Sequence, residues 1–362
     1  MKIGVLGSGQ LGRMLALSAY PLGHQMSFLA SSEEDPSSLL GNTFIQNGSQ
    51  EIIEEFAKNS DVVTYESENT AVSIVKEISQ KTMVYPSAKS LYTSQHRGRE
   101  KSLFDKLNIP CAPYQMVNNL QELKIAVEKI GLPAILKTAT DGYDGKGQFL
   151  IQSDSQLDQA WKSMSGVESI LEGFINFKRE LSLVAVRGVD NSHEYYPLVE
   201  NSHHNGILRL TIAPAQNISP KLQQQAETYM RSLLDEMNHV GVLTIELFET
   251  DSNLVVNEMA PRVHNSGHWT IEGSRTSQFE NHIRAITETP LGDTSCTHEY
   301  SAMINIIGEQ GPINKALTLK NAHLHLYNKT ERKGRKLGHI TITANTVDDL
   351  NSSLETLSDF MP

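Results

Sequence analysis

Short apolar runs alternate with amphipathic segments along the first part of the chain. Residues 2–6 and 25–30 are β-prone apolar runs, and residues 10–20 between them place apolar side chains at helical spacing. A helix at 50–59 and a strand at 61–65 continue the alternation. Strands that alternate with helices form parallel sheets whose faces the helices cover. The pattern therefore predicts an N-terminal parallel α/β domain.

The rest of the chain mixes the two periodicities. Its predicted elements are helix 93–107, extended stretch 110–117, helix 120–130, strands 134–137 and 149–152, strands through 180–188, helix 220–238, and short tail strands before a helix near 347–358. The chain of 362 residues is too long for one ordinary core. We predict a mixed α/β (α+β) protein with domains at 1–92, 93–296 and 297–362, the last small and β-rich.

Two glutamates lie on opposite arms of a predicted β-hairpin. Its strands are residues 242–248 and 254–259, and a three-residue loop at 251–253 places Glu246 opposite Glu258. The same register pairs Thr250 with Leu254 and Phe248 with Val256. Opposed carboxylates repel each other unless a cation joins them, and oxygen ligands suit Mg²⁺. The alternative is a slipped register that leaves one glutamate solvated.

An unusually polar segment follows this hairpin directly. Arg262, His264, Asn265, Ser266 and His268 occur within a few positions of the end of the second strand. A solvated loop could carry any one of these residues, but it would rarely need all of them. Polar and ionisable side chains placed by a buried strand are typical of a ligand-binding site.

Composition and charge narrow the function classes. The net charge of −11 argues against a nucleic-acid partner, and no apolar run approaches the roughly 20 residues of a membrane helix. Cys111 and Cys296 are the two cysteines, which suggests a reducing cytoplasm and excludes a cysteine-based metal site. The first residues enter a glycine turn and do not resemble a signal peptide. Because the chain is acidic overall, an anionic substrate must be held by local cations.

The segment at residues 7–12 fits the pattern G-x-G-x-x-G between a strand and a helix. Glu33 and Glu34 lie where the ribose-binding acid of a dinucleotide site would be. A dehydrogenase-like dinucleotide site is one interpretation. Tight packing of the strand against the helix is the other, because the glycines indicate only that some anion or element approaches the helix N-terminus.

A second glycine-rich segment, residues 141–148, lies between two strands rather than before a helix. It is therefore not a P-loop. Its glycines and its lysine could close over phosphates as a lid, although an exposed turn is the simpler alternative. Lys137 weakens that alternative, because a lysine at the end of a buried strand should face an anion. Arg97 is a further candidate cation.

Two other motifs indicate a function only in combination with the hairpin and the glycine-rich segments. Residues 172–175 form an apolar run headed by an acid, which alone is an ordinary strand edge. Residues 329–339 form the densest basic cluster of an acidic chain, between β-like runs at 322–327 and 339–343. A solvated charge run is the usual explanation for such a cluster. Its two glycines and flanking strands favour a phosphate site instead.

Together these segments resemble the ATP-grasp superfamily, and more narrowly its 5-(carboxyamino)imidazole ribonucleotide synthase family. The matching stretches are GSGQLGRM at 7–14, KTATDGYDGKGQ at 137–148, EMAPRVHNSGHWT at 258–270, SQFENHIRAI at 277–286 and GRKLGH at 334–339. They span essentially the whole chain. Asp141 stands where the family usually has glycine, and Val263 and Lys333 stand where proline is common. The first change could stiffen the lid or alter its charge.

The resemblance implies an ATP-grasp fold in which a pre-grasp domain helps to hold the second substrate and a lid covers about residues 113–175. It implies ATP contacts from Arg97, Lys137, Tyr143, Asp144, Gly145, Lys146, Gly147, Gln148, Glu172, Gly173, Phe174, Ile175, Glu180, His204, Asn257 and Glu258. It implies Mg²⁺, or Mn²⁺, on Glu246 and Glu258, and no biotin. Ribonucleotide contacts are expected from Gln10, Leu11, Lys329, Arg335 and Lys336. Catalytic candidates are Tyr143, Asp144, Arg262, His264 and Asn265.

The implied reaction is the ATP-dependent carboxylation of 5-aminoimidazole ribonucleotide by bicarbonate, through carboxyphosphate, in purine biosynthesis. The expected enzyme is a cytoplasmic homodimer with small-molecule substrates and without membrane or nucleic-acid partners. His264 and Asp144 are equally defensible as the general base. The alternatives are a sister ATP-grasp ligase that makes a formyl-transfer or amide product and, resting on the first glycine motif alone, a nucleotide-dependent dehydrogenase.

Overall fold

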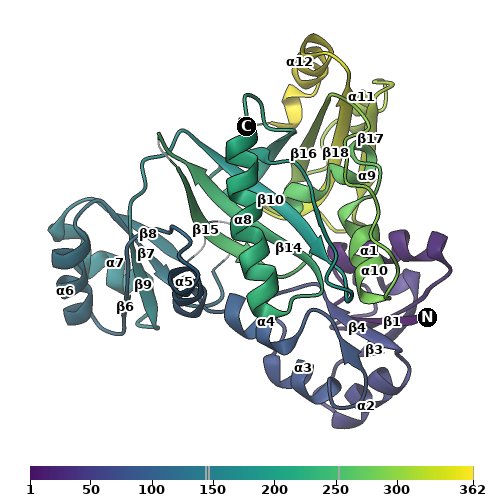
Figure 1. Ribbon diagram of the computed structural model, residues 1–362, viewed down its shortest axis with the longest axis horizontal. Helices are drawn as coiled ribbons and strands as arrows, with labels where there is room; N and C mark the ends of the chain where they lie inside the picture. The colour runs from purple at the N-terminus through teal and green to yellow at the C-terminus, as the bar shows by residue number, and fades with distance from the viewer. Residues whose placement is uncertain (143–144, 146, 252, 362) are drawn as a thin grey trace.

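The computed structural model describes residues 1–142, 145, 147–251 and 253–361. Their strands form three sheets, designated A, B and C. Figure 1 shows sheet A at the lower right and the small sheet C at the left, with the large sheet B extending from the centre into the C-terminal region at the top.

Sheet A is parallel, as the sequence predicted, with strand order β3-β2-β1-β4-β5. Its strands are β1 (Lys2–Leu6), β2 (Gln25–Ala30), β3 (Asn42–Ile45), β4 (Val62–Tyr65) and β5 (Met83–Val84). Its helices are α1 (Gln10–Ala19), α2 (Gln50–Lys58) and α3 (Val72–Ile78). Strands β3 and β5 and helix α3 go beyond the predicted elements. They are short and only partly buried, so their apolar pattern is weak.

Sheet C has four antiparallel strands in the order β6-β9-β7-β8. They are β6 (Tyr114–Val117), β7 (Ala134–Thr138), β8 (Gln148–Ile151) and β9 (Ser169–Gly173). Helices α6 (Leu120–Ile130) and α7 (Leu157–Ser163) share one apolar cluster with the sheet, which includes Leu123, Leu136 and Leu171. The second glycine-rich segment joins β7 to β8 as a hairpin connection, with Lys137 paired to Gln148.

Sheet B has nine strands in the order β15-β14-β10-β12-β13-β16-β18-β17, with β11 paired to β10. They are β10 (Arg179–Arg187), β11 (His193–Tyr195), β12 (Val199–His204), β13 (Ile207–Ala213), β14 (Gly241–Glu249), β15 (Leu254–Ala260), β16 (Tyr300–Ile307), β17 (Ala322–Leu326) and β18 (Lys336–Ala344). The predicted β-rich tail is present. Its strands continue this sheet, because β16 pairs with β13 through Leu210 and Ile304.

Helices cover both faces of sheet B. Figure 1 shows α8 crossing the face formed by β10, β14 and β15, where its apolar residues join one core cluster. The remaining helices are α4 (Ala88–Ser94), α5 (Arg97–Lys106), α8 (Pro220–Met237), α9 (Thr270–Gly273), α10 (Gln278–Ile286), α11 (Ile313–Ala316) and α12 (Val347–Thr356). None of the described helices combines the length and apolar character that a membrane crossing requires.

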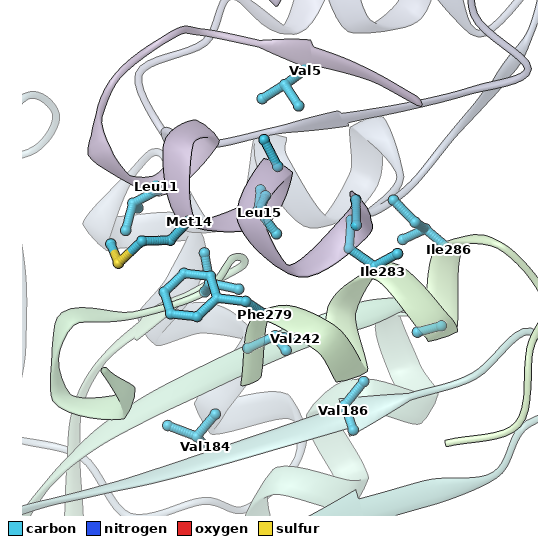
Figure 2. Close-up of a cluster of buried hydrophobic side chains, with 14 of the residues drawn as sticks. Val5, Leu11, Met14, Leu15, Val184, Val186, Val242, Phe279, Ile283 and Ile286 are labelled. Atoms are coloured by element: carbon cyan, nitrogen blue, oxygen red, sulfur yellow. The ribbon is translucent and has the colours of Figure 1, made fainter. Parts of the chain in front are cut away.

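The opposite face of sheet B is joined to sheet A by a shared core. Figure 2 shows Phe279, Ile283 and Ile286 of α10 facing α1, with the sheet beneath α10. The labelled partners are Leu11, Met14 and Leu15 on α1, Val5 on β1, Val184 and Val186 on β10, and Val242 on β14. Full burial of each such side chain stabilises the fold by about 1.5–3 kcal/mol. This packing fixes the N-terminus of α1 beside sheet B.

Candidate active site

A cavity of about 740 Å³ opens where the loops of sheet A meet sheets B and C. Its lining is strongly ionisable. The lining residues from sheet A loops include Gln10, Leu11, Glu66 and Glu68; those from sheet C and its loop include Lys137, Gly142, Gly145 and Gln148; and those from sheet B include Glu180, Glu246, Asn257, Glu258 and Lys336. Arg262, His264, Asn265 and His268 complete the side nearest sheet A. Segments far apart in the sequence thus share one site.

The hairpin of β14 and β15 places Glu246 opposite Glu258, as predicted, but through a different register. The observed pairs are Glu249–Leu254, Phe248–Val255, Leu247–Val256 and Glu246–Glu258. The predicted pairing of Thr250 with Leu254 is wrong, because Thr250 bonds to Asn253 inside the turn, at 3.0 Å between its amide nitrogen and the Asn253 carbonyl. A β-bulge beside Glu246 takes up Asn257 as an extra residue and restores the pairing of the glutamates.

The two glutamates have different electrostatic surroundings. Burial raises the pKa of Glu246 to about 7, and the charge of Glu258 adds to the rise. Burial would also raise the pKa of Glu258, but Arg97 outweighs it and the pKa falls below its usual value. Arg97 Nη1 lies 2.8 Å from Glu258 Oε2. The pair is therefore short of positive charge on the side of Glu246.

These residues fit a divalent cation. Two opposed carboxylates, one with a raised pKa, gain from a positive ion between them. Within the described ranges, no cluster of three or more histidine, cysteine or acidic side chains could enclose a metal. A cation held here would need further oxygen ligands, and Mg²⁺ commonly takes these from nucleotide phosphates and water.

Lys137 stands at the wall between sheets C and B. Its ammonium donates to Glu172 Oε2 at 2.7 Å and approaches Asn257 Oδ1 at 3.5 Å. Glu172 lies behind Lys137, only 3% exposed, and is outside the cavity lining. Burial would raise the pKa of Glu172, but Lys137 and Lys101 lower it to about 2. Glu172 is thus a buried counter-ion of the lysine.

The first glycine-rich segment holds a side chain of the protein itself. The amides of Gly9 and Gly12 donate to separate oxygens of Glu66, at 2.5 and 2.7 Å. A Cβ atom added to Gly7 would lie 2.6 Å from this carboxylate. The anion at the N-terminus of α1 is therefore internal. This arrangement removes the basis of the dinucleotide interpretation, because Glu66 occupies the place of a pyrophosphate.

Arg262 is neutralised by a bidentate ion pair. Its Nη2 donates to Glu68 Oε1 at 2.8 Å, and its Nε contacts the other carboxylate oxygen. Burial would raise the pKa of Glu68, but Arg262 lowers it to about 2. This pair ties the loop after β4 to the segment after β15. It also presents Arg262 to the cavity as part of a charge-balanced group.

His264 is held as a neutral imidazole with a defined tautomer. Burial and the charge of Arg262 lower its pKa to about 3. Its Nδ1 accepts the amide proton of Ser266 at 3.3 Å, so the ring proton of the neutral form is on Nε2. Nε2 lies 3.5 Å from Glu246 Oε1. In this state His264 presents a donor toward the carboxylate, not a base.

The basic cluster of the tail divides between two positions. Lys336, at the start of β18, lines the cavity, and Lys329 donates to Gln10 of the first glycine segment. Burial lowers the pKa of Lys329 to about 8, and the nearby charge of Arg335 adds to the decrease. Arg335 is outside the lining and its Nη1 donates to Thr330 Oγ1 at 2.7 Å.

The structure brings most of the predicted site residues to one place. Those that line the cavity are Gln10, Leu11, Arg97, Lys137, Gly145, Gln148, Glu180, Glu246, Asn257, Glu258, Arg262, His264, Asn265 and Lys336. Those placed outside its lining are Gly147, Glu172, Gly173, Phe174, Ile175, His204, Lys329 and Arg335. Tyr143, Asp144 and Lys146 lie outside the described residues. The roles of all these site residues remain predictions.

Sequence reasoning missed several residues of this cavity. His203 lines it in place of the exposed His204, and its Nδ1 lies 3.1 Å from Glu180 Oε2. Phe177 and Phe248 stack with ring centroids 4.6 Å apart and provide an apolar wall. Glu66 and Glu68 carried a usable signal, because they directly follow the buried strand β4. Polar residues at the carboxyl end of a parallel strand mark ligand sites.

Family models match all three parts of the fold. The ATP-grasp domain model matches residues 102–279, and the ribonucleotide synthetase preATP-grasp domain model matches residues 1–95. The phosphoribosylaminoimidazole carboxylase C-terminal domain model matches residues 301–353. These matches confirm the predicted fold class.

Known proteins resemble the chain over nearly its full length. N5-carboxyaminoimidazole ribonucleotide synthase of Pseudomonas aeruginosa is 46% identical over 343 residues, which are 94% of each chain. Among solved structures, N5-carboxyaminoimidazole ribonucleotide synthetase of Thermus thermophilus has a TM-score of 0.94 at 44% identity, covering 99% of this chain and 98% of that one. The synthase of Aspergillus clavatus, in complex with ADP and 5-aminoimidazole ribonucleotide, has a TM-score of 0.92 at 33% identity, covering 99% and 98%.

Proposed function

The chain belongs to the N5-carboxyaminoimidazole ribonucleotide synthase family of ATP-grasp ligases, and from this we propose that its cavity carboxylates 5-aminoimidazole ribonucleotide. ATP and bicarbonate are the other substrates; N5-carboxyaminoimidazole ribonucleotide, ADP and phosphate are the products, within purine biosynthesis. One observation carries the proposal. A single cavity is lined by a lysine and a carboxylate pair from sheets C and B, and also by the pre-grasp loop and the tail lysine Lys336. It therefore suits two phosphorylated ligands.

ATP is assigned to the end between sheets B and C. Lys137 and Arg97 provide positive charge there, and the stacked rings of Phe177 and Phe248 provide an apolar surface for a base. Lys137 is already paired with Glu172, so the buried counter-ion keeps the ammonium in place before phosphate arrives. The Aspergillus clavatus protein in complex with ATP, at 33% identity and a TM-score of 0.93, supports ATP as a ligand of this chain.

The ribonucleotide is assigned to the end beside sheet A. Lys329 and Lys336 supply cations near Gln10, and in a chain of net charge −11 such cations must be local. Arg335 is proposed as a further phosphate contact because it lies close enough to Lys329 to lower its pKa. The complex of a relative with ADP and 5-aminoimidazole ribonucleotide supports two ligands in one such enzyme.

The proposed chemistry has two steps. A bicarbonate oxygen attacks the γ-phosphorus of ATP, which breaks the bond to ADP and gives carboxyphosphate. The exocyclic amine of the ribonucleotide then attacks the carboxyl carbon, phosphate leaves, and the amine loses a proton. Lys137 stabilises charge on the transferring group, and closure of the proposed lid over the cavity would limit hydrolysis of carboxyphosphate.

Residues beside the second step have distinct proposed roles. Arg262, balanced by Glu68, positions the anionic carboxyl group. His264 acts as a hydrogen-bond donor, because its Nδ1 accepts from Ser266 and its proton is on Nε2. This tautomer favours Asp144 over His264 as the base that takes the amine proton. Asp144 is outside the described residues, so the choice remains a prediction.

We further propose that Glu246 and Glu258 hold Mg²⁺. The ion supplies positive charge to the phosphates of ATP when it is bound. Arg97 holds one oxygen of Glu258, which fixes that carboxylate and leaves the other oxygen directed away from the ion pair. A homodimer in the cytoplasm completes the proposal. The free thiols of Cys111 and Cys296 agree with a reducing compartment.

Release of ADP tests the proposed function. Purified protein with Mg·ATP should release ADP only when 5-aminoimidazole ribonucleotide and bicarbonate are both present. Formate in place of bicarbonate should give no turnover, and the product should carry label from ¹³C-bicarbonate. Turnover with formate, or ADP release that ignores the ribonucleotide, would instead indicate a sister ligase.

Two variants add a matched control to this assay. Glu258→Gln removes a proposed metal ligand and should abolish most turnover, whereas Glu249→Gln lies on the same hairpin outside the cavity lining and should retain it. Calorimetric titration with Mg·ADP should show weaker binding by Glu258→Gln alone. Equal binding by both variants would contradict the metal assignment.

A further inference from the structure

One face of helix α5 contacts three consecutive residues of strand β15. Figure 1 shows α5 between sheet C and the strands β14 and β15. Arg97 donates to Glu258 at 2.8 Å, which is the ion pair described above. One turn further along, Glu100 Oε1 accepts the amide of Met259 at 2.6 Å. Lys101 Nζ donates to the carbonyl of Asn257 at 2.8 Å. Residues at i, i+3 and i+4 share a helix face, so the three contacts form one set.

The segment that α5 contacts lacks the usual partners of a strand. Strand β15 is the edge of sheet B, and among the described residues no strand of that sheet pairs with its outer amides and carbonyls. The bulge adds to this, because Asn257 has no directly opposed residue on β14. The carbonyl of Pro110 accepts the amide of Val256 at 2.8 Å. Glu100 and Lys101 supply the next two partners, so the bulge depends on them for its shape.

Lys101 also reaches the opposite wall of the ATP cleft. Its ammonium lies 3.7 Å from Glu172 Oε1, while the other oxygen of Glu172 accepts from Lys137. Asn257 belongs to sheet B, whereas Glu172 and Lys137 belong to sheet C. One buried ammonium thus joins the two sheets behind the nucleotide position.

The burial of these two ionisable side chains requires good partners. Lys101 is 0% exposed and Glu100 is 2% exposed, and neither lines the cavity. The ammonium of Lys101 loses its hydration in the interior, and only well-placed partners replace it. Burial raises the pKa of Glu100 to about 8, so this side chain depends on its hydrogen bond rather than on a full charge. The partners here are the backbone of the bulge and the counter-ion of Lys137. Both are groups that set positions at the site.

We propose that Glu100 and Lys101 are positioning residues that hold the bulged segment 257–259, and so place Glu258 and Asn257 against Lys137 for binding of Mg·ATP. This inference rests on the proposed function, because it takes Glu258 as a metal ligand. Glu100 acts by accepting the amide of Met259, and Lys101 acts by joining the bulge to Glu172. Neither residue touches substrate.

The first test replaces Lys101 with methionine, which keeps most of the aliphatic stem and removes the ammonium. Lys106→Met is the matched control, because Lys106 is on the same helix and pairs with Glu236 at the surface. Lys101→Met should weaken Mg·ADP binding in calorimetry by about ten- to a hundredfold, as is typical when a supporting contact of a ligand is lost. The KM for 5-aminoimidazole ribonucleotide should stay within about twofold, because that site is at the other end of the cavity. Lys106→Met should match the wild type.

A second pair of variants keeps the proposal falsifiable if Lys101→Met does not fold. Glu100→Gln retains an oxygen that can accept the amide of Met259, whereas Glu100→Leu does not. Mg·ADP should bind Glu100→Gln nearly as tightly as wild type and bind Glu100→Leu much more weakly. Equal binding by the two variants would overturn the role of Glu100.

The readout separates positioning from a general structural role. A merely structural Lys101 would lower the unfolding temperature of Lys101→Met and leave the Kd of Mg·ADP unchanged, which would overturn the proposal. The titration does not depend on carboxylation. A wild-type protein that binds Mg·ADP but does not consume bicarbonate would therefore refute the proposed function alone.

Discussion

The two glycine-rich segments of this chain have opposite surroundings. In the first, residues 7–12, the amides of Gly9 and Gly12 are already bound to the carboxylate of Glu66. In the second, residues 141–148, Gly142 and Gly145 line the cavity. Gly145 also lies against the turn between β12 and β13, where an added Cβ would be 3.0 Å from the Cα of Gly206. The glycine amides of the first segment are bonded within the protein, whereas the described glycines Gly142 and Gly145 of the second line the cavity.

The difference shows what a glycine pattern does and does not establish. Glycines before a helix allow an anion to approach the backbone amides, and this is true of a side chain as much as of a phosphate. The sequence distance between Gly9 and Glu66 conceals the partner. Only the parallel pairing of β1 with β4 brings the two loops to the same sheet edge. Variants of Glu66 and Asp141, together with amide exchange, test this difference between the two segments.

The largest effect is expected from Glu66→Gln. Two amides donate to separate oxygens of Glu66, and glutamine offers only one, so its NH₂ group would face a second donor. The variant should lose about 1–3 kcal/mol of unfolding free energy in urea denaturation. Glu34→Gln is the control, because Glu34 is exposed beyond β2 and is the acid that a dinucleotide site would need. An unchanged urea midpoint for Glu66→Gln would contradict a stabilising role for the contacts of Glu66 with the first glycine segment.

The stability difference between the wild type and Glu66→Gln should also depend on pH. Burial raises the pKa of Glu66 above its usual 4.5, and the amides of Gly12 and Gly9 lower it only in part. Just above pH 4.5 the folded protein therefore keeps a proton that the unfolded chain has released. The retained proton stabilises the folded protein. This stabilisation is fully present below the pKa of Glu66 in the unfolded chain and is lost as pH rises through the pKa of Glu66 in the folded protein, by at most about 1.4 kcal/mol per pH unit. The difference in unfolding free energy between the wild type and Glu66→Gln should therefore decrease as pH rises from 4.5 through the folded-state pKa of Glu66.

An intermediate effect is expected in amide exchange. Saturating Mg·ATP should slow exchange in the peptide that spans residues 141–148, because this segment is proposed to close over the phosphates. Exchange in the peptide that spans residues 7–12 should not change, because its glycine amides are already bonded to Glu66. Hydrogen exchange followed by mass spectrometry measures both peptides in one sample. Equal protection of the two segments would contradict the contrast between them.

The smallest effect is expected from Asp141→Gly. Asp141 has a φ of 60°, a left-handed conformation that glycine adopts without the steric cost of a side chain. Glycine also loses more entropy on folding, so the net stabilisation should be below about 1 kcal/mol. Asp141→Asn serves as the control for charge, because asparagine tolerates the same backbone conformation. A loss of stability in Asp141→Gly would show that the aspartate side chain contributes more than its backbone costs.

The sequence predicted the architecture well where periodicity is strong. The parallel sheet around β1, the two strands that flank the second glycine-rich segment, and the opposed glutamates follow from clearly patterned runs of residues. The register near the turn was wrong because hydrogen bonds between Thr250 and Asn253 close the turn one residue earlier than predicted, and the extra residue of the bulge then compensates. Propensity does not reveal a bulge, because it depends on partners such as Lys101 that are distant in the chain.

The candidate site was harder to predict where partners distant in the sequence determine the position or protonation of a side chain. The residues around His264 were identified from their local density, but the tautomer of its ring depends on Ser266 and its pKa on burial. Glu66 and Glu68 were missed because the glycine motif drew attention to the acids after β2. Glu172 was expected among the ATP contacts, and the structure places it behind Lys137, outside the cavity lining.

The pairing of β13 with β16 has a consequence for how this protein can be divided. Family models separate the tail from the ATP-grasp region by sequence, at residues 279 and 301. In the fold, that boundary runs through a continuous sheet, and a fragment ending before β16 would expose the edge of β13, including Leu210 and Ile212. Exposed strand edges pair readily with other chains. The tail is therefore not a detachable module, and truncated or fused versions of the enzyme should retain β16 and its neighbours to stay free of aggregation.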